Sequence, residues 1–152
     1  MEEAMYEEIK RAKPTELQKK WADMEVGVII HYLMDIYNPS YRGFKTNGVR
    51  TELPASKFAP QGWDTDQWMM SAAAAGAKYA VLVANHCTGF SLWQTKVNDY
   101  SVASCPYKDG KGDIVREFIE SCKKYGIKGV LLRDFLKTEH SAFLEGKKDH
   151  PH

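Results

Sequence analysis

Residues 77–93 read AKYAVLVANHCTGFSLW, and their character changes abruptly in the middle. The first part, Tyr79–Ala84, is a continuous apolar run without alternation, which is typical of a strand buried on both faces in a parallel α/β sheet. A buried helix segment is the alternative, but the run is short and Gly76 precedes it. A polar segment, Asn85–Gly89, follows directly. After it comes a largely apolar segment that ends in Trp93. Ligand sites of α/β folds lie at the carboxyl ends of parallel strands, so this is the strongest candidate site in the chain.

A second apolar run, Val26–His31 (VGVIIH), also ends in a histidine. One histidine in such a place is more often a hydrogen-bonded structural residue than a ligand-binding one. Parallel strands bring their carboxyl ends to the same edge of a sheet, so we expect His31 and His86 to share a site. A nucleophilic pair of His86 and Cys87 is disfavoured, because adjacent residues of a strand point to opposite faces.

Length and composition indicate a single globular domain. The chain has 152 residues, of which 43% are hydrophobic and 27% charged, with a formal net charge of +1. This charge gives no sign of the basic surface that nucleic-acid binders usually carry. Three cysteines without CxxC spacing predict neither a disulfide framework nor a zinc site. Lys108–Gly112 (KDGKG) lacks the phosphate-loop pattern and is interpreted as a loop before a helix, so we expect no metal and no cofactor.

The sequence contains no candidate for membrane insertion or secretion. Its apolar runs fall well short of the roughly 20 residues of a membrane span. The first residues, MEEAMYEEIKRAK, are acidic and lack the apolar centre of a secretory signal. The localisation is therefore left open.

Helix and strand signals alternate along the chain. Helical patterns cover residues 2–12, 15–24, 64–76, 114–125 and 133–144, and a third strand is expected at 128–132. The inward faces of the helices 64–76 and 114–125 are expected to hold Trp68, Met69, Ala72 and Ala75, and Ile114, Val115, Phe118, Ile119 and Cys122. The resulting order, with right-handed βαβ units, predicts an α/β fold that is either a doubly wound sheet or part of a barrel. Long βα loops and short αβ links favour about three βα units of a (β/α)8, TIM-type barrel, preceded by N-terminal helices.

Several motifs together resemble family 29 of the glycoside hydrolases, the α-L-fucosidases. The family has an apolar strand followed by Ala-Lys-His-His, a Gly-Phe, a Leu-Trp and later a Gly-Asp-Val-Val-Arg-Glu helix start. This chain has Ala84–Cys87 (ANHC), Gly89-Phe90, Leu92-Trp93 and Gly112–Glu117 (GDIVRE) at the matching places. Val28–Tyr32 (VIIHY) is similar to the family's Phe-Ile-His-Trp strand. The resemblance covers about residues 21–128 and implies the N-terminal part of a retaining glycosidase barrel that takes fucosylated glycans or glycosides.

The resemblance also implies roles for individual residues. His31 and His86 match family histidines that bind fucose hydroxyls, and Trp93 would form an apolar wall of the sugar site. Two positions depart from the family, because Asn85 replaces a lysine and Cys87 replaces the second histidine of the pair. The family's Glu-Trp motif is also missing from the loop that follows the first strand.

No catalytic residue is assigned from the sequence. Retaining hydrolysis needs a nucleophile and an acid/base carboxyl group about 5–5.5 Å apart. In the family both follow later strands, and the match fades after Lys128, so we expect the chain to be an incomplete catalytic domain whose residues 133–152 form an atypical tail. The alternative is a non-catalytic fragment that binds a sugar or self-assembles through unpaired sheet edges. Self-assembly of this kind would produce a homo-oligomer. Family members are commonly secreted, periplasmic or lysosomal.

Overall fold

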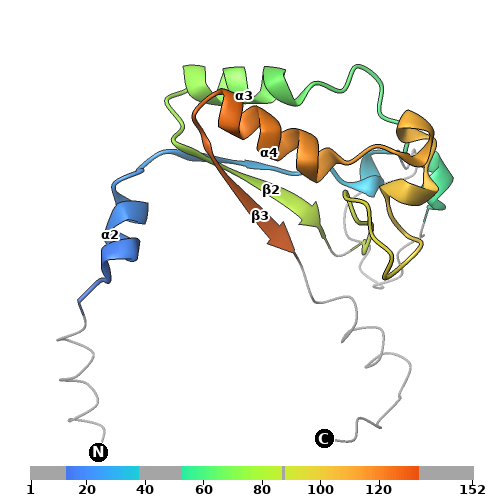
Figure 1. The fold of residues 1–152 in the computed structure, drawn as a ribbon, viewed down its shortest axis with the longest axis horizontal. Helices are drawn as coiled ribbons and strands as arrows, with labels where there is room; N and C mark the ends of the chain where they lie inside the picture. Colours follow the sequence, from blue (N-terminus) through green and yellow to red (C-terminus); the bar gives the residue numbers. More distant parts are fainter. Residues whose placement is uncertain (1–12, 38–52, 87, 134–152) are drawn as a thin grey trace, which may run out of the picture.

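The computed structural model describes residues 13–37, 53–86 and 88–133. Within them a three-stranded sheet carries two helices on one face, while a shorter helix precedes the first strand (Figure 1). The helices are α2 (Glu16–Ala22), α3 (Thr65–Ala74) and α4 (Ile114–Lys124). The strands are β1 (Gly27–Ile30), β2 (Tyr79–Asn85) and β3 (Lys128–Arg133). Short 3₁₀ turns occur at Met34–Tyr37, Ala55–Lys57, Val102–Ser104 and Tyr107–Gly110.

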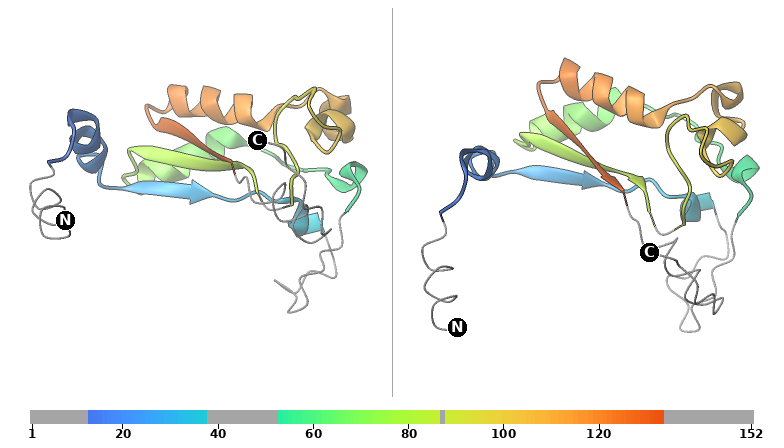
Figure 2. Two further views of the ribbon diagram at one scale, coloured as in Figure 1. Left: turned by 90° about the horizontal axis from the view of Figure 1, so that it is seen from below. Right: turned by 60° about the horizontal axis from the view of Figure 1, so that its bottom comes forward.

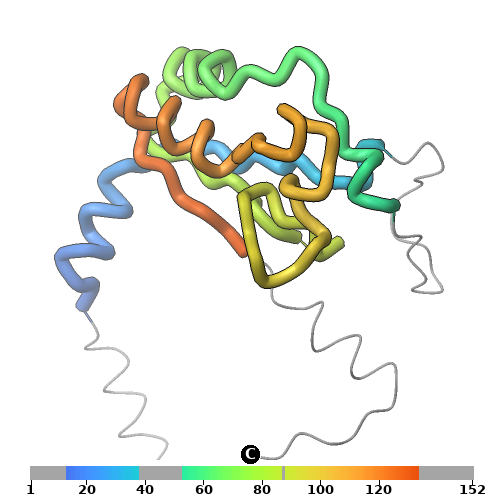
Figure 3. Tube along the Cα trace, turned by 45° about the vertical axis from the view of Figure 1, so that its right-hand side comes forward, coloured from blue at the N-terminus to red at the C-terminus, as the bar shows by residue number. Residues whose placement is uncertain are grey.

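The sheet is parallel throughout, as the alternating sequence pattern predicts. Its strand order is β1-β2-β3, so β2 is central and bonds to both neighbours. Gly27 pairs with Tyr79, and Tyr79 pairs with Lys128, so the three strands start in one row. Within the described residues, each crossover contributes one α-helix, α3 before β2 and α4 before β3. The carboxyl ends of the strands therefore meet at one edge, beside the segment 94–112 (Figure 3).

The core lies between the sheet and the pair α3 and α4, which cover the same face in all the ribbon views (Figure 2). Ala80 and Leu82 of β2 are fully buried in this core, together with Phe118 of α4 and Met69 of α3. The two helix starts are capped by aspartates. Asp64 accepts from the backbone N–H groups of Asp66 and Gln67, and Asp113 accepts from that of Arg116. Such caps satisfy N–H groups that would otherwise lack partners at a helix start.

The helix predictions that fall on described residues hold with two corrections. Cys122 is buried in the core as expected, but Ala75 is exposed, because α3 ends one residue before it and Gly76 turns the chain away at φ 82°. The helix expected at residues 15–24 ends at Ala22, and none of its residues is buried. The ring of Trp21 lies 4.4 Å from that of Tyr79, at the start of β2. The expected helix at residues 2–12 lies outside the described residues.

The sheet itself departs from the expectation in two ways. Ile29 of β1 is 63% exposed, because none of the described helices covers the face opposite α3 and α4 there. Arg133 belongs to β3 instead of opening a last helix, and the remainder of that expected helix, with the atypical tail, lies outside the described residues. Among the helices that the structure describes, none has the length and apolar character needed to cross a bilayer.

Candidate functional site

His31 and His86 lie together at the carboxyl edge of the sheet, as the sequence predicts. His31 follows the last residue of β1, and His86 follows the last residue of β2. Their ring centroids are 5.6 Å apart, in an edge-on arrangement with an interplanar angle of 63°. His31 is exposed and His86 is partly exposed, so a solute can reach this edge of the sheet. Two adjacent ring systems with nitrogen donors or acceptors suit a ligand rich in hydroxyl groups.

A register shift in β2 explains how the two imidazoles reach the same side. Val28 and Ile30 pack toward the helices, so His31 falls on the opposite, open side of β1 by alternation. Leu82 also packs toward the helices, and strict alternation would therefore put His86 on the helix side. The pairing of β2 with β3 shifts between Val83 and Asn85, which inserts one extra residue. An inserted residue reverses the alternation beyond it, and such irregularities re-aim side chains beside functional sites.

The segment that follows His86 is tied back to the end of β2 at two points. The backbone N–H of Leu92 donates to the carbonyl of Ala84 at 3.0 Å. The side-chain amide of Asn85 donates to Ser91 Oγ at 3.3 Å, and both residues are buried. Ser91 in turn pairs with Ser101 through the backbone, in an isolated parallel bridge. These bonds hold Ser91 and Leu92 close to the end of β2, directly before His86.

The other residues expected at the site are less fully placed. Trp93 comes directly after Leu92, so its backbone starts beside the end of β2, and its side chain is partly buried. Its role as a wall of a sugar site stays a prediction. Cys87 lies outside the described residues.

An aromatic cluster lies beside this edge of the sheet and includes two tyrosines, Tyr32 and Tyr37, from the irregular segment after the first strand. Tyr32 is its centre, with its ring 4.3 Å from that of Trp63 and 5.8 Å from that of Phe58. The hydroxyl groups of Tyr32 and Tyr37 are 2.7 Å apart, within hydrogen-bond distance. Burial, followed by this hydrogen bond, raises the pKa of Tyr37 above its usual range, so the Tyr37 hydroxyl stays protonated. Because Tyr32 directly follows His31, the cluster fixes the chain at the first histidine. The spacing of aromatic residues in the irregular segment gave no helical or strand period that could have revealed it.

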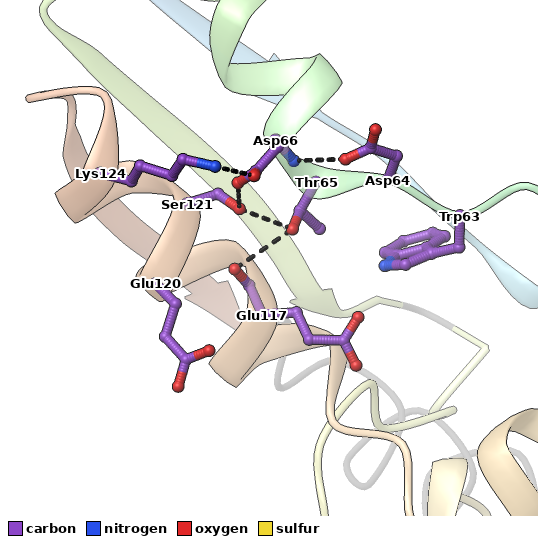
Figure 4. Close-up of a pocket in the computed structure, with 8 residues that line it drawn as sticks. All are labelled: Trp63, Asp64, Thr65, Asp66, Glu117, Glu120, Ser121 and Lys124. Atoms are coloured by element: carbon purple, nitrogen blue, oxygen red, sulfur yellow. Dashed lines mark hydrogen bonds and ion pairs between the residues drawn. The ribbon is translucent and has the colours of Figure 1, made fainter.

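A cleft between α3 and α4 is a competing candidate, but several of the polar side chains that line it bind one another (Figure 4). Asp66 binds Lys124 in an ion pair and accepts from Ser121 Oγ at 2.6 Å. Lys124, then Ser121, lower the pKa of the Asp66 carboxyl. The hydroxyls of Ser121 and Thr65 are 2.8 Å apart and buried, and Asp64 caps α3. These contacts join two helices, which is a structural role.

Metal chemistry finds no support in the described ranges. Within residues 13–37, 53–86 and 88–133, no three His, Cys, Asp or Glu side chains are grouped closely enough to hold an ion. The two described cysteines are buried and unpaired, and burial raises the pKa of both thiols. A buried thiol with a raised pKa is a poor nucleophile.

Comparison with known proteins connects this geometry to one family. The family model for alpha-L-fucosidase matches residues 35–152. Tissue alpha-L-fucosidase of Mus musculus is 32% identical over 117 residues, which cover 73% of this chain and 25% of the mouse protein.

Solved structures agree with the sequence comparison. A glycoside hydrolase 29 family member from an unknown rumen bacterium has a TM-score of 0.69 and 33% identity, over 79% of this chain and 21% of that one. The alpha-L-fucosidase of Lactobacillus casei, solved in complex with alpha-L-fucose product, has a TM-score of 0.62 and 25% identity, over 76% of this chain and 39% of that one. The chain thus spans about a quarter of the mouse relative's length and belongs to the α-L-fucosidase family, glycoside hydrolase family 29.

Proposed function

We propose that the His31–His86 edge is the fucose-binding part of an α-L-fucosidase-type active site, and that the sheet with its two crossovers is the first part of a (β/α)8 barrel. The observation that carries the proposal is the edge-on contact of the two imidazoles, 5.6 Å apart, at the ends of adjacent parallel strands. This is the edge at which barrel enzymes bind their substrates. The Lactobacillus casei relative, whose structure holds the sugar product, supports the choice of ligand.

The chemistry of the pair suits a neutral sugar. A neutral imidazole has one N–H donor and one nitrogen acceptor, so it can bond to a hydroxyl in either direction. Two imidazoles from different strands fix the relative positions of two hydroxyls, and thereby select one stereochemistry. Trp93 would add an apolar surface for the C–H face and the methyl group of fucose.

The carboxyl groups of the reaction are not assigned to this chain. Retaining hydrolysis requires a nucleophile and an acid/base group. Several described carboxylates already have structural partners. Asp113 caps α4, and Glu117 accepts from the Tyr107 hydroxyl at 2.9 Å and pairs with Lys108 at 2.7 Å. What we assign to the described residues is therefore sugar binding, the step that positions a terminal α-L-fucosyl group for hydrolysis.

Titration of the chain with L-fucose, followed by NMR chemical shifts, tests the proposal. D-Fucose is the matched control ligand, because it is the mirror image and has the same composition and polarity. We expect the shifts of the residues around His31 and His86 to move with L-fucose only. Loss of one hydrogen-bonding imidazole should cost about 1–1.5 kcal/mol, so His86→Ala should weaken binding by roughly tenfold. Val97→Ser, at a 90% exposed position, should leave binding unchanged.

Two results would overturn the proposal. Equal shifts with the two enantiomers would show that the edge has no stereochemical preference. Unchanged binding in both His31→Ala and His86→Ala would show that the histidines do not contact the sugar. An aryl α-L-fucoside assay on the same samples separates binding from turnover, since binding without hydrolysis is what the alternative of a non-catalytic sugar-binding chain requires.

A further inference from the structure

We propose that Asn85 is a positioning residue, which holds His86 beside His31 through its hydrogen bond to Ser91. The proposal deepens the fucose-binding function proposed above and rests on it only where sugar affinity is concerned. It concerns a position at which this chain carries an amide in place of the lysine expected from the family resemblance.

The first argument is burial. Asn85 is 8% exposed and Ser91 is 1% exposed, so their hydrogen bond is shielded from water. A buried polar group without a partner is costly, typically about 1–3 kcal/mol, and this cost favours conformations that keep the bond. A buried side-chain bond of this kind specifies one loop geometry.

The second argument is where the bond lies. Asn85 occupies the position at which the register of β2 shifts, and His86 is the next residue. Without an anchor after the shift, the chain could return to regular alternation, which would turn His86 toward the helix side. The amide of Asn85 reaches Ser91, and Ser91 is itself fixed by backbone bonds to Tyr100 and Val102, each 3.0 Å long. Asn85 thus ties the shifted conformation to a rigid neighbour.

The third argument is the size of the loop that the bond closes. Only five residues separate Asn85 from Ser91, and they include His86. Within them the N–H of Gly89 donates to the His86 carbonyl at 2.7 Å, and the N–H of Phe90 lies 3.4 Å from Thr88 Oγ1. A small loop with internal bonds and a fixed closing point leaves few positions for its first residue. The bond between Asn85 and Ser91 therefore restricts the backbone at His86.

The test compares Asn85→Ala and Ser91→Ala with Ser121→Ala in the 152-residue chain. Ser121→Ala is the matched control, because it also removes a buried hydroxyl with a hydrogen-bond partner, the Thr65 hydroxyl at 2.8 Å, in the helix layer. The primary measurement is the NMR spectrum of the two imidazole rings without sugar, in which the close ring–ring contact is visible as a nuclear Overhauser effect. The second measurement is the affinity for L-fucose.

We expect both variants at the Asn85–Ser91 bond to lose the effect between the His31 and His86 rings and to bind L-fucose about five- to tenfold more weakly, which is the loss of one buried hydrogen bond. The double variant should be no worse than either single one, because the two side chains act as a pair. Ser121→Ala should retain the ring contact and the affinity, even if its unfolding midpoint falls as much as those of Asn85→Ala and Ser91→Ala.

Three outcomes would refute the proposal. One is an unchanged ring contact in Asn85→Ala, and another is additive effects of Asn85→Ala and Ser91→Ala. The third is equal loss of the ring contact in Ser121→Ala, which would indicate general loosening. If the unaltered chain binds no L-fucose, the fucose-binding function fails, while the ring contact still decides the role of Asn85.

Discussion

Replacing Gly129 with alanine should destabilise the protein, because α4 passes directly over this residue of β3. A methyl group there would lie 2.9 Å from Ile119 Cδ1, 3.2 Å from Cys122 Sγ and 3.4 Å from Cys122 Cβ. Favourable contacts between carbon atoms begin near 3.5 Å. The end of the Ile119 side chain can turn aside, but Cys122 is 1% exposed and lies against Met69, with 3.4 Å between the two sulfurs. The helix must therefore move away from the sheet.

The magnitude follows from two opposing effects. Adding a methyl group to a filled core typically costs about 1–3 kcal/mol. Removing the backbone freedom of a glycine from a strand returns about 0.5–1 kcal/mol. We expect a net loss of about 1–2 kcal/mol in the free energy of unfolding, which lowers the urea midpoint by roughly 0.5–1 M for ordinary denaturant slopes.

A double variant makes this prediction specific. Cys122→Ala removes the sulfur atom that the new methyl group would meet, although it leaves a small cavity of its own. The loss in Gly129→Ala with Cys122→Ala should therefore be smaller than the sum of the two single losses. A Gly129→Ala midpoint equal to that of the unaltered chain, or strictly additive losses, would refute the idea that α4 and β3 are in closest contact here.

Three further outcomes are expected. Thr65→Val should lower the free energy of unfolding by about 1–3 kcal/mol, because it leaves the buried Ser121 hydroxyl with one partner fewer, and urea unfolding measures this. Asp113→Ala should cost about 0.5–2 kcal/mol through loss of the cap on the Arg116 N–H, and hydrogen exchange should increase most in the first turn of α4. Burial raises the pKa of the Cys122 thiol from 9.0 to about 11, so the stability due to this thiol is fully present below pH 9 and is lost as the pH rises toward about 11. Between pH 9 and about 11, the urea midpoint of Cys122→Ala should therefore fall less than that of the unaltered chain. An equal fall in the two proteins would contradict the raised pKa of this thiol.

The regular elements could be predicted because each depends on a local signal. The apolar run Tyr79–Ala84 gave β2 to within one residue, and Asp64 and Asp113 marked the starts of α3 and α4. The exposure of Ile29 could not be predicted in the same way. An apolar run indicates that a strand prefers burial on both faces, but the covering of its faces depends on elements far away in the chain.

The candidate site was predictable in outline and hidden in detail. Two strands ending in histidine predicted that His31 and His86 would meet, and their ring contact confirms it. Alternation alone would have placed them on opposite sides of the sheet, and the register shift near Asn85 has no signature in the sequence. Asn85, beside the shift, is hydrogen-bonded to Ser91, which lies in a segment without any regular period.

The central position of β2 has a consequence for the order of folding. Every strand pair in this sheet joins residues roughly fifty positions apart, and contacts of such large separation form slowly. β2 must pair on both of its edges, with a segment made before it and a segment made after it. During synthesis β1, α3 and β2 leave the ribosome before β3, so the first crossover can dock early, and the β3 edge of β2 stays bare until Lys128–Arg133 has emerged. The last step in the assembly of these three strands should therefore be the arrival of α4 and β3, and core substitutions in α4 should mainly change the rate of that step.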